Sequence, residues 1–122
     1  MPAPTPAASA GSERVPVAET LPPLDDDGFL QDTHRWTESI ARAFAAQEGI
    51  TLDARHIEVL LALRRYHAQH GHSPAMRAFV SLVRRELGPE KGRSVYLLGL
   101  FPGSPAKLAA RIAGLPRPEH CL

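Results

Sequence analysis

The sequence contains a single cysteine, Cys121, which is the residue before the last one in the chain. One cysteine excludes a disulfide within the chain, and it excludes the usual cysteine-based zinc sites, which need at least two thiolate ligands. No apolar run approaches the roughly 20 residues that are needed to cross a bilayer. The net charge of +1 at pH 7 provides no general electrostatic attraction to nucleic acid or to a membrane surface. We therefore expect a cytosolic protein with no membrane partner, no metal and no cofactor.

Large apolar side chains are also missing from residues 1–12 after Met1, where Pro, Ala, Ser, Thr and Gly make up the whole segment. Such a segment cannot bury enough apolar surface to offset the entropy lost on ordering, so a disordered leader is predicted. It has neither the basic start nor the apolar centre of a signal peptide. The remaining length suits one domain, which we expect over residues 13–114, followed by an arm over residues 115–122.

Residues 13–30 have short apolar runs that are broken by prolines and followed by an Asp-Gly turn signal. A short N-terminal β-hairpin or an extended arm is predicted there. Pro22 and Pro23 would confine any strand to the edge of a sheet, because proline cannot donate a hydrogen bond to a neighbouring strand.

Helical patterns begin at Asp32, and five helices with short connections follow. Four have both start and stop signals: Asp32 or Thr33 before Gly49, Asp53 before Gly71, Ser73-Pro74 before Gly88, and Ser104-Pro105 before Gly114. The remaining one is a short helix that Ser94 can cap. Residues 53–70 carry the broadest apolar surface, which is typical of the central helix of a bundle. The predicted fold class is therefore an all-α bundle of about five helices.

Two other hypotheses arise from the helical region. His67, His70 and His72 cluster where the second helix ends, but no carboxylate or cysteine lies nearby in sequence to complete a metal site. His56, in a first helical turn, is interpreted as structural. The segment 57–87 is a helix, a short turn and a helix, which is also the pattern of a DNA-binding helix-turn-helix. Its second helix offers Arg77, Arg84 and Arg85 but lacks the Asn or Gln that often contacts adenine, so direct nucleic-acid binding is not favoured.

The pattern changes after Gly114. Pro116 and Pro118 cannot continue a helix and bias the residues before them towards extended conformations. The arm from Leu115 to Leu122 would span about 26 Å when fully extended. We expect few core contacts beyond Gly114, so the arm would be mobile and could carry Cys121 into the active site of another protein.

Several segments together resemble the DsrC/TusE family of sulfur-relay proteins, which are related to the gamma subunit of dissimilatory sulfite reductase. The resemblance extends from about Asp25 to Leu122 and rests on the order and spacing of "DDDGFL", "EGI", "SPAMR", "LGPEKGRSVYLLGLFP", "SPAK" and "RIAGLPRPEHCL". Ser104 stands where the family usually has Gly, and it should be tolerated as an N-cap.

The resemblance implies a sulfurtransferase in which Cys121 accepts sulfane sulfur as a persulfide and passes it on. In the TusE branch, sulfur arrives from a TusBCD-type complex (DsrEFH-like) and goes to a tRNA thiouridylase that makes 2-thiouridine. In the DsrC branch, the partner is sulfite reductase, and a second cysteine lies eleven residues before the last one. Ala110 occupies that position here. The resemblance therefore favours a relay with a single thiol over the two-cysteine redox cycle.

The thiolate is the reactive form of the cysteine, so charges near Cys121 affect its reactivity. His120 and Arg117 would favour the thiolate, whereas Glu119 and the Leu122 carboxylate would oppose it. Nine residues of the motif segments quoted above are expected to shape the arm or the surface on which it docks. They are Gly114, Pro116, Arg117, Pro118, His120, Arg77, Lys91, Tyr96 and Lys107. A cationic lining would suit the terminal carboxylate or a persulfide anion.

Overall fold

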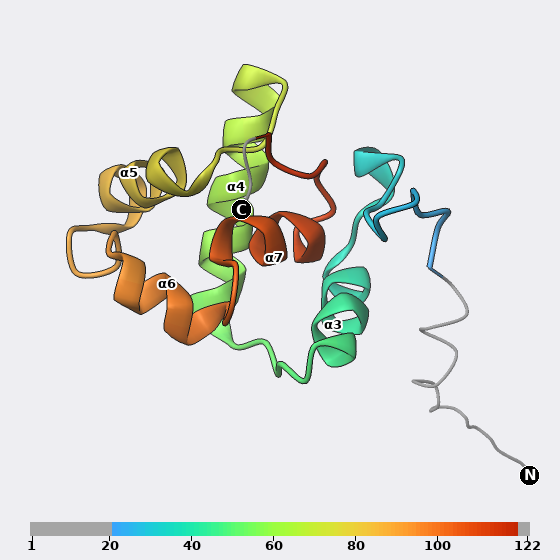
Figure 1. The fold of residues 1–122 in the computed structure, drawn as a ribbon, viewed down its shortest axis with the longest axis horizontal. Coiled ribbons are helices and arrows are strands. Elements are labelled where there is room, and N and C mark those ends of the chain that lie inside the picture. The colour runs from blue at the N-terminus through green and yellow to red at the C-terminus, as the bar shows by residue number, and fades with distance from the viewer. Residues whose placement is uncertain (1–20, 120–122) are drawn as a thin grey trace, which may run out of the picture.

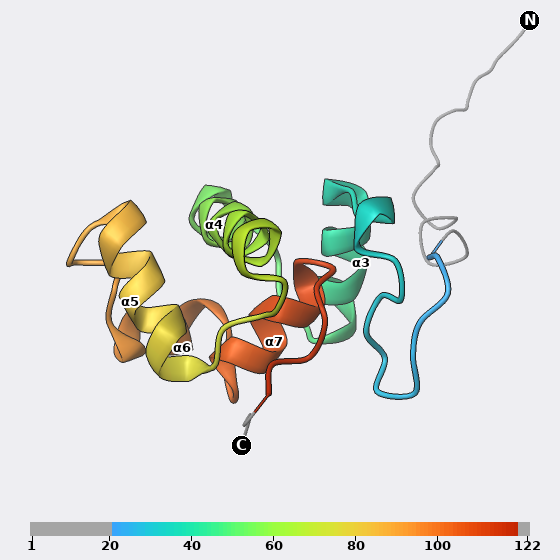
Figure 2. The ribbon, with the colours of Figure 1, turned by 90° about the horizontal axis from the view of Figure 1, so that it is seen from above.

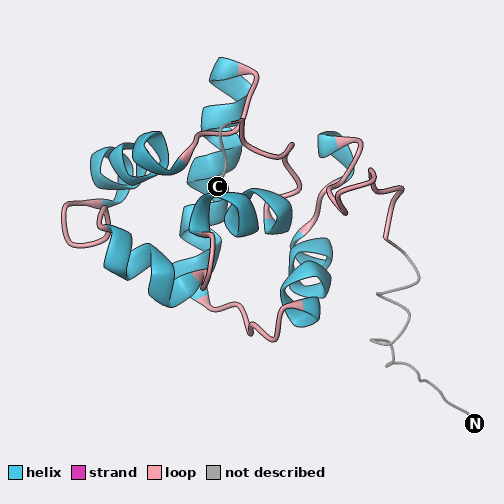
Figure 3. Cartoon of the chain, viewed as in Figure 1, coloured by secondary structure: helices cyan, strands magenta, loops and turns pink. Residues whose placement is uncertain are grey.

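A computed structural model of the chain describes residues 21–119. Within these residues the protein consists of α-helices joined by short connections, with no strand (Figure 1, Figure 3). The elements in chain order are the 3-10 helix η1 (Thr33–Arg35), α3 (Glu38–Gln47), α4 (Ala54–His70), α5 (Met76–Leu87), α6 (Ser94–Leu100) and α7 (Pro105–Ile112). The predicted all-α bundle of five helices is confirmed.

The segment before the helices forms a turn rather than a strand pair. Asp25 to Phe29 is a turn in which the Asp25 carboxylate accepts hydrogen bonds from the backbone N–H groups of Asp27 and Phe29. A single antiparallel bridge joins Leu24 and Leu30. Of the predicted hairpin over residues 13–30, the described part therefore contains only this bridge. Residues 13–20 and the predicted leader lie outside the described residues.

The second helix begins and ends where its sequence signals predicted. The Asp53 carboxylate accepts a hydrogen bond from the Arg55 N–H, and the His56 ring accepts one from the Asp53 N–H, which together form a capping box. Gly71 closes the other end of α4 in the left-handed conformation at φ +78°. These signals are local, so the sequence alone was sufficient to place this helix.

Three of the predicted helix starts are wrong. The helix expected from Asp32 is divided: Asp32 caps η1, Trp36 is extended, and the Thr37 side chain caps α3 by accepting from the Ile40 N–H. Helix α5 begins at Met76 with Ala75 as its N-cap, so Ser73 does not cap it. Helix α6 has Arg93 at its N-cap, and Ser94 is its first helical residue. The Ser104-Pro105 start of α7 is confirmed.

The central helix of the bundle is α7 rather than α4. Helix α7 packs against α3, α4, α5 and α6, whereas α4 packs mainly against α5 and α7. In Figure 2, α7 lies between α3 and the α5–α6 pair and runs beneath α4. Ala106, Ala109 and Ala110 are buried in α7, and their small side chains let neighbouring helices approach from several directions. The breadth of an apolar surface was thus a poor guide to centrality, because a short alanine-rich helix can be surrounded without being strongly apolar.

The core joins all five helices to the two chain segments that flank them. Its largest fully buried side chains are Phe29, Phe44, Phe79, Phe101, Leu60, Leu63, Leu82, Leu97, Ile112, Leu115, Val59 and Val83. Phe29 comes from the N-terminal turn, and Leu115 lies beyond the end of α7. Both ends of the described chain are therefore fixed to the same core.

Candidate functional site

The C-terminal segment leaves α7 through a Schellman motif. The Leu115 N–H donates to the Ala110 carbonyl over 2.9 Å, and the Gly114 N–H donates to the Arg111 carbonyl over 3.1 Å. Gly114 adopts φ +72°, a backbone conformation that residues other than glycine rarely adopt. The predicted end of the helix at Gly114 is confirmed, and the motif turns the chain back towards the helical body.

Trp36 packs directly against this turn. The indole Nε1–H donates to the Ile112 carbonyl over 2.8 Å. A Cβ atom at position 114 would lie 2.4 Å from Cδ1 of Trp36, which is far inside van der Waals contact. Gly114 is therefore required for two separate reasons, its backbone conformation and the approach of the indole ring.

Arg64 of α4 joins the same cluster from the other side. Its guanidinium donates to the Ala113 carbonyl over 2.8 Å and to the Thr33 carbonyl over 2.9 Å, and it stacks over the Trp36 ring at 4.5 Å. Burial lowers the pKa of the Arg64 guanidinium below its ordinary value. Arg64 therefore satisfies a carbonyl at the end of α7 and connects α4 to η1 through one side chain.

The next residues remain attached to the body. Leu115 is 1% exposed and belongs to the core, and Pro118 is buried. The Ser73 hydroxyl, in a side chain that is 4% exposed overall, donates to the Pro116 carbonyl over 2.6 Å. Arg117 is exposed and lies 3.5 Å from the Asp27 carboxylate, which is a weak surface pair. The expectation of few core contacts beyond Gly114 is wrong, because Leu115 supplies an apolar side chain that the core accommodates.

We call residues 113–118 the arm root and residues 119–122 the arm tip. Glu119 is exposed, and His120, Cys121 and Leu122 lie outside the described residues. A cleft of about 420 Å³ adjoins the root and is lined by Thr33, His34, Arg64, His67, Ala68 and Leu115. Burial, together with the nearby charge of Arg64, lowers the pKa of His67, so its ring favours the neutral form.

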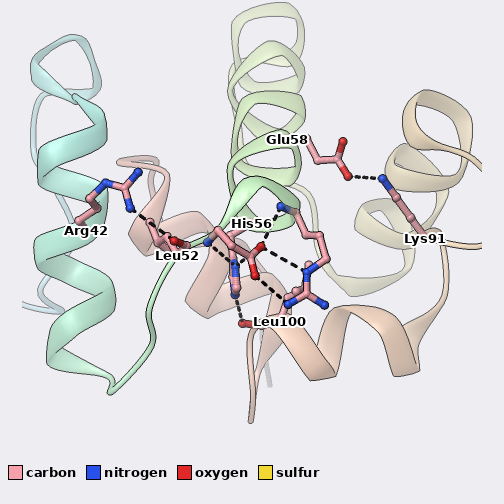
Figure 4. A network of polar contacts seen from close by, with 8 residues as sticks. Arg42, Leu52, His56, Glu58, Lys91 and Leu100 are labelled. Atoms are coloured by element: carbon pink, nitrogen blue, oxygen red, sulfur yellow. Dashed lines mark hydrogen bonds and ion pairs between the residues drawn. The ribbon is translucent and has the colours of Figure 1, made fainter.

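The remaining predicted residues lie on several parts of the body. Arg77 is exposed on α5, and Lys107 is exposed on α7, where it lines a separate cleft of about 320 Å³ together with Arg111. Lys91, between α5 and α6, is paired with Glu58 of α4 (Figure 4), and this hydrogen bond raises the pKa of the Lys91 ammonium. The Tyr96 hydroxyl is a buried side-chain polar atom that has no hydrogen-bond partner within residues 21–119. The structure does not bring these residues together around the arm root, so their predicted role in docking stays a prediction.

His56 occupies a structural position, in agreement with its interpretation from the sequence. It is 5% exposed, and its Nε2 lies 3.1 Å from the Leu100 carbonyl while Nδ1 meets the Asp53 N–H (Figure 4). An Nε2–H that donates to the Leu100 carbonyl leaves Nδ1 to accept from the Asp53 N–H. His56 therefore connects the start of α4 to the end of α6.

Sequence reasoning did not recognise Trp36, Arg64 and Ser73 as residues that hold the arm root. For Arg64 the sequence did contain an indication of this role, because Arg64 lies on the same side of its helix as Ile57, Leu60 and Leu61. If other elements cover that side, the guanidinium must find hydrogen-bond partners there. The sequence pattern predicted Ser73 to be a helix cap and gave Trp36 no separate role. Their real partners lie 76 and 43 residues away in the chain, and no local pattern indicates such pairs.

The fold and the arm root define a small helical protein that ends in a segment carrying one thiol. Comparison with known proteins identifies its family: residues 17–122 match the family described as DsrC like protein. The sulfurtransferase TusE of Salmonella paratyphi A is 46% identical over 98 residues, which cover 80% of this chain and 90% of that protein. TusE of Pectobacterium atrosepticum is 44% identical over the same shares of the two chains. The chain belongs to the DsrC family, as its resemblance to the DsrC/TusE proteins predicted.

Solved structures agree with this assignment. DsrC of Allochromatium vinosum superimposes with a TM-score of 0.74 at 38% identity, covering 81% of this chain and 88% of that one. The oxidized gamma-subunit of the dissimilatory sulfite reductase (DsrC) from Archaeoglobus fulgidus gives a TM-score of 0.70 at 39% identity, covering 82% and 91%. The protein is a sulfurtransferase of the sulfur-relay type, and the helix-turn-helix alternative is not favoured. No helix within residues 21–119 is long and apolar enough to span a membrane.

Proposed function

We propose that Cys121 accepts sulfane sulfur as a persulfide from a donor protein and passes it to an acceptor protein. The observation that supports this most directly is the position of the only thiol in the chain, three residues beyond an arm root that is fixed to the core. Relatives that are 46% identical over most of both chains are named sulfurtransferases. A sulfur carrier needs one accessible thiol near a chain end, and this chain has one thiol in total.

The proposed transfer consists of two exchanges of the same kind. The Cys121 thiolate attacks the outer sulfur of the donor persulfide, the S–S bond of the donor breaks, and the donor leaves as a thiolate. Cys121 then holds the outer sulfur as a persulfide. In the second exchange, an acceptor thiolate attacks that outer sulfur and the Cys121 thiolate is released. Neither exchange requires an external oxidant or reductant, because one S–S bond forms as another breaks.

The side chains of the arm set the charge around this chemistry. Arg117 and His120 are positioned in sequence to favour the thiolate, while Glu119 and the Leu122 carboxylate oppose it. Exposed Arg77 and Lys107 are the better candidates to meet an anionic arm tip, because the charge of Lys91 is already paired with Glu58. Charge removal at Arg77 or Lys107 should weaken docking if the tip lies near either residue.

We propose a cytoplasmic relay of the TusE kind, with a TusBCD-like donor and a tRNA thiouridylase as acceptor. Ala110 supports this branch, because the single thiol of this chain cannot form the internal disulfide of the two-cysteine cycle. A free thiol also suits a reducing compartment. Association with sulfite reductase is the second candidate, because the similar Archaeoglobus fulgidus structure is described as a subunit of that enzyme. Reconstitution with each acceptor, scored by 2-thiouridine formation or by binding to sulfite reductase, separates the two.

Persulfide formation can be tested by mass spectrometry of the intact protein. Incubation with a persulfidated donor should add the mass of one sulfur atom to the wild type, and a thiol reductant should remove it. The Cys121→Ser variant differs by one atom and should gain nothing. Sulfur addition to that variant at the wild-type level would contradict the proposal, because no other thiol is present.

A further inference from the structure

We propose that Ser73, Arg64 and Trp36 are positioning residues for sulfur transfer, because they fix the arm root and so define where Cys121 can meet a partner. This inference rests on the proposed role of Cys121 as the sulfur carrier. It goes beyond that role by assigning a function to three side chains that touch neither sulfur nor the thiol.

The first observation is the number and direction of the contacts. Trp36 binds the Ile112 carbonyl, Arg64 binds the Ala113 carbonyl, and Ser73 binds the Pro116 carbonyl, over 2.8, 2.8 and 2.6 Å. The three donors come from the segment before α3, from α4, and from the connection between α4 and α5. Donors on three separate elements restrain a short segment against both translation and rotation, which a single contact could not do.

The second observation is that the Ser73 contact lies beyond the end of α7 and beyond the buried Leu115. Leu115 anchors the segment through burial, and the Schellman motif satisfies the Ala110 and Arg111 carbonyls. Trp36 and Arg64 bind the two carbonyls that remain at the end of α7. The Ser73 bond lies one residue beyond Leu115, at Pro116, which is an exposed residue. A buried residue whose hydroxyl binds an exposed residue of the arm root fixes the direction in which the chain leaves the helical body.

The consequence is a short reach. If the chain is fixed as far as Pro118, the α-carbon of Cys121 lies at most roughly 10 Å from that of Pro118. An arm that was free from Leu115 would extend about twice as far. A donor or acceptor must therefore bring its reacting sulfur to the surface around Pro118 and enclose the tip there. A fixed root also restricts the orientations that Cys121 can adopt, which raises the fraction of encounters in which the two sulfur atoms can react.

The chain is well suited to test this inference by energy transfer. It has one tryptophan, Trp36, which lies against the root, and one cysteine near the tip, so a thiol-reactive acceptor dye on Cys121 needs no further substitution. Ser73→Ala removes only the bond to Pro116, and Ser81→Ala is the matched control at an exposed serine of α5. We expect Ser73→Ala to widen the distribution of donor lifetimes and Ser81→Ala to leave it as in the wild type. An unchanged distribution in Ser73→Ala would overturn the positioning role.

Transfer kinetics supply the functional test. With a persulfidated donor protein, Ser73→Ala should lower kcat/KM roughly tenfold, mainly through kcat, because the donor still binds but the sulfur atoms meet less often in a reactive geometry. With a small-molecule persulfide, which needs no aimed arm, both serine variants should load Cys121 at the wild-type rate. Wild-type kcat/KM for Ser73→Ala with the protein donor would overturn the inference. Failure of the wild type to load from either donor would instead contradict the carrier role of Cys121.

Arg64→Lys provides an independent variant. Lysine keeps the charge but cannot bind the Ala113 and Thr33 carbonyls together while stacking on Trp36. We expect Arg64→Lys also to lower kcat/KM with the protein donor and to load Cys121 from the small-molecule persulfide at the wild-type rate. If Arg64→Lys fails to fold, the Ser73→Ala result decides the question by itself, since that substitution removes only one hydroxyl group.

Discussion

Single residues determine how the arm begins, and Gly114 is the most constrained of them. It combines a left-handed backbone with an indole ring at its α-carbon, whereas Gly49 has a matching position at the end of α3 without a neighbour. Gly49 adopts φ +73°, and its N–H donates to the Ala46 carbonyl in the same type of helix-ending motif. Substituting each of the two glycines therefore separates the free-energy cost of the left-handed backbone from the cost of the contact with the indole ring.

Gly114→Ala should destabilise the protein by roughly 3 kcal/mol, and Gly49→Ala by about 1 kcal/mol. Both variants place a side chain in the left-handed conformation, but only the first drives a methyl group into Trp36. Urea unfolding followed by circular dichroism measures both losses. Equal losses would show that Trp36 moves aside without cost, and the contact would then contribute nothing to fixing the arm root.

Helix elements depend on local capping, and α4 has the clearest cap. The hydrogen bond from the Arg55 side chain to the Asp53 carboxylate lowers the pKa of Asp53 well below its ordinary value of 3.8, and the Arg55 backbone N–H contributes further. A carboxyl with a depressed pKa stabilises the folded state above its ordinary pKa and loses that contribution as the pH falls. The cap of α4 should therefore weaken in acid.

Asp53→Asn should reduce stability near neutral pH, and its difference from the wild type should shrink as the pH falls below about 4. Asparagine still caps the helix but cannot ionise, so only the charge-dependent part is removed. Urea titrations at a series of pH values measure the difference. Asp26→Asn removes an exposed carboxyl that makes no hydrogen bond within the described part of the chain, and it serves as the control. A difference for Asp53→Asn that stayed constant with pH would exclude the proposed cause.

At the scale of the whole molecule, the arm root and the helical bundle form one structure. Leu115 is buried in the core that also contains Phe29 and Ile112, so a residue beyond the last helix supports the fold. Removal of residues 115–118 would therefore damage the fold as well as shorten the arm. Changes confined to Ser73 or to the arm tip are better probes of transfer.

Leu115→Ala should cost about 3 kcal/mol of unfolding free energy, as expected for a leucine removed from a packed core. Leu61 of α4 is 41% exposed, and Leu61→Ala should cost less than about 1 kcal/mol. The two substitutions delete the same atoms, so their difference measures burial. A small loss for Leu115→Ala would mean that the arm root does not contribute to the core in solution.

The leader should be separable from the domain. The family match begins at residue 17, and residues 1–12 contain no large apolar side chain after Met1. Deleting residues 2–12 should change the unfolding free energy by less than about 0.5 kcal/mol and leave transfer from a persulfidated donor at the wild-type rate. A loss of transfer with unchanged stability would instead assign the leader a role in partner binding.

The sequence by itself determined the class of fold, the bounds of α4 and the family. Asp53 and Gly71 act on the backbone within a few residues, so their effect is visible in a local pattern. The proposed role of Cys121 in sulfur chemistry rests on motif order and spacing, which belong to the sequence itself. The resemblance to sulfur-relay proteins needed no tertiary structure.

Only the tertiary structure showed that the arm is fixed as far as Pro118 and that α7 is the central helix. Ser73 resembles a helix cap, yet its hydroxyl binds a carbonyl 43 residues away, and Arg64 reaches a carbonyl at a separation of 49. Such pairs form because folding brings distant segments together and their remaining polar groups then require partners. A pattern of neighbouring residues indicates a turn or a cap, because those interactions act within a few residues. It does not indicate which distant carbonyl will face a given hydroxyl or guanidinium.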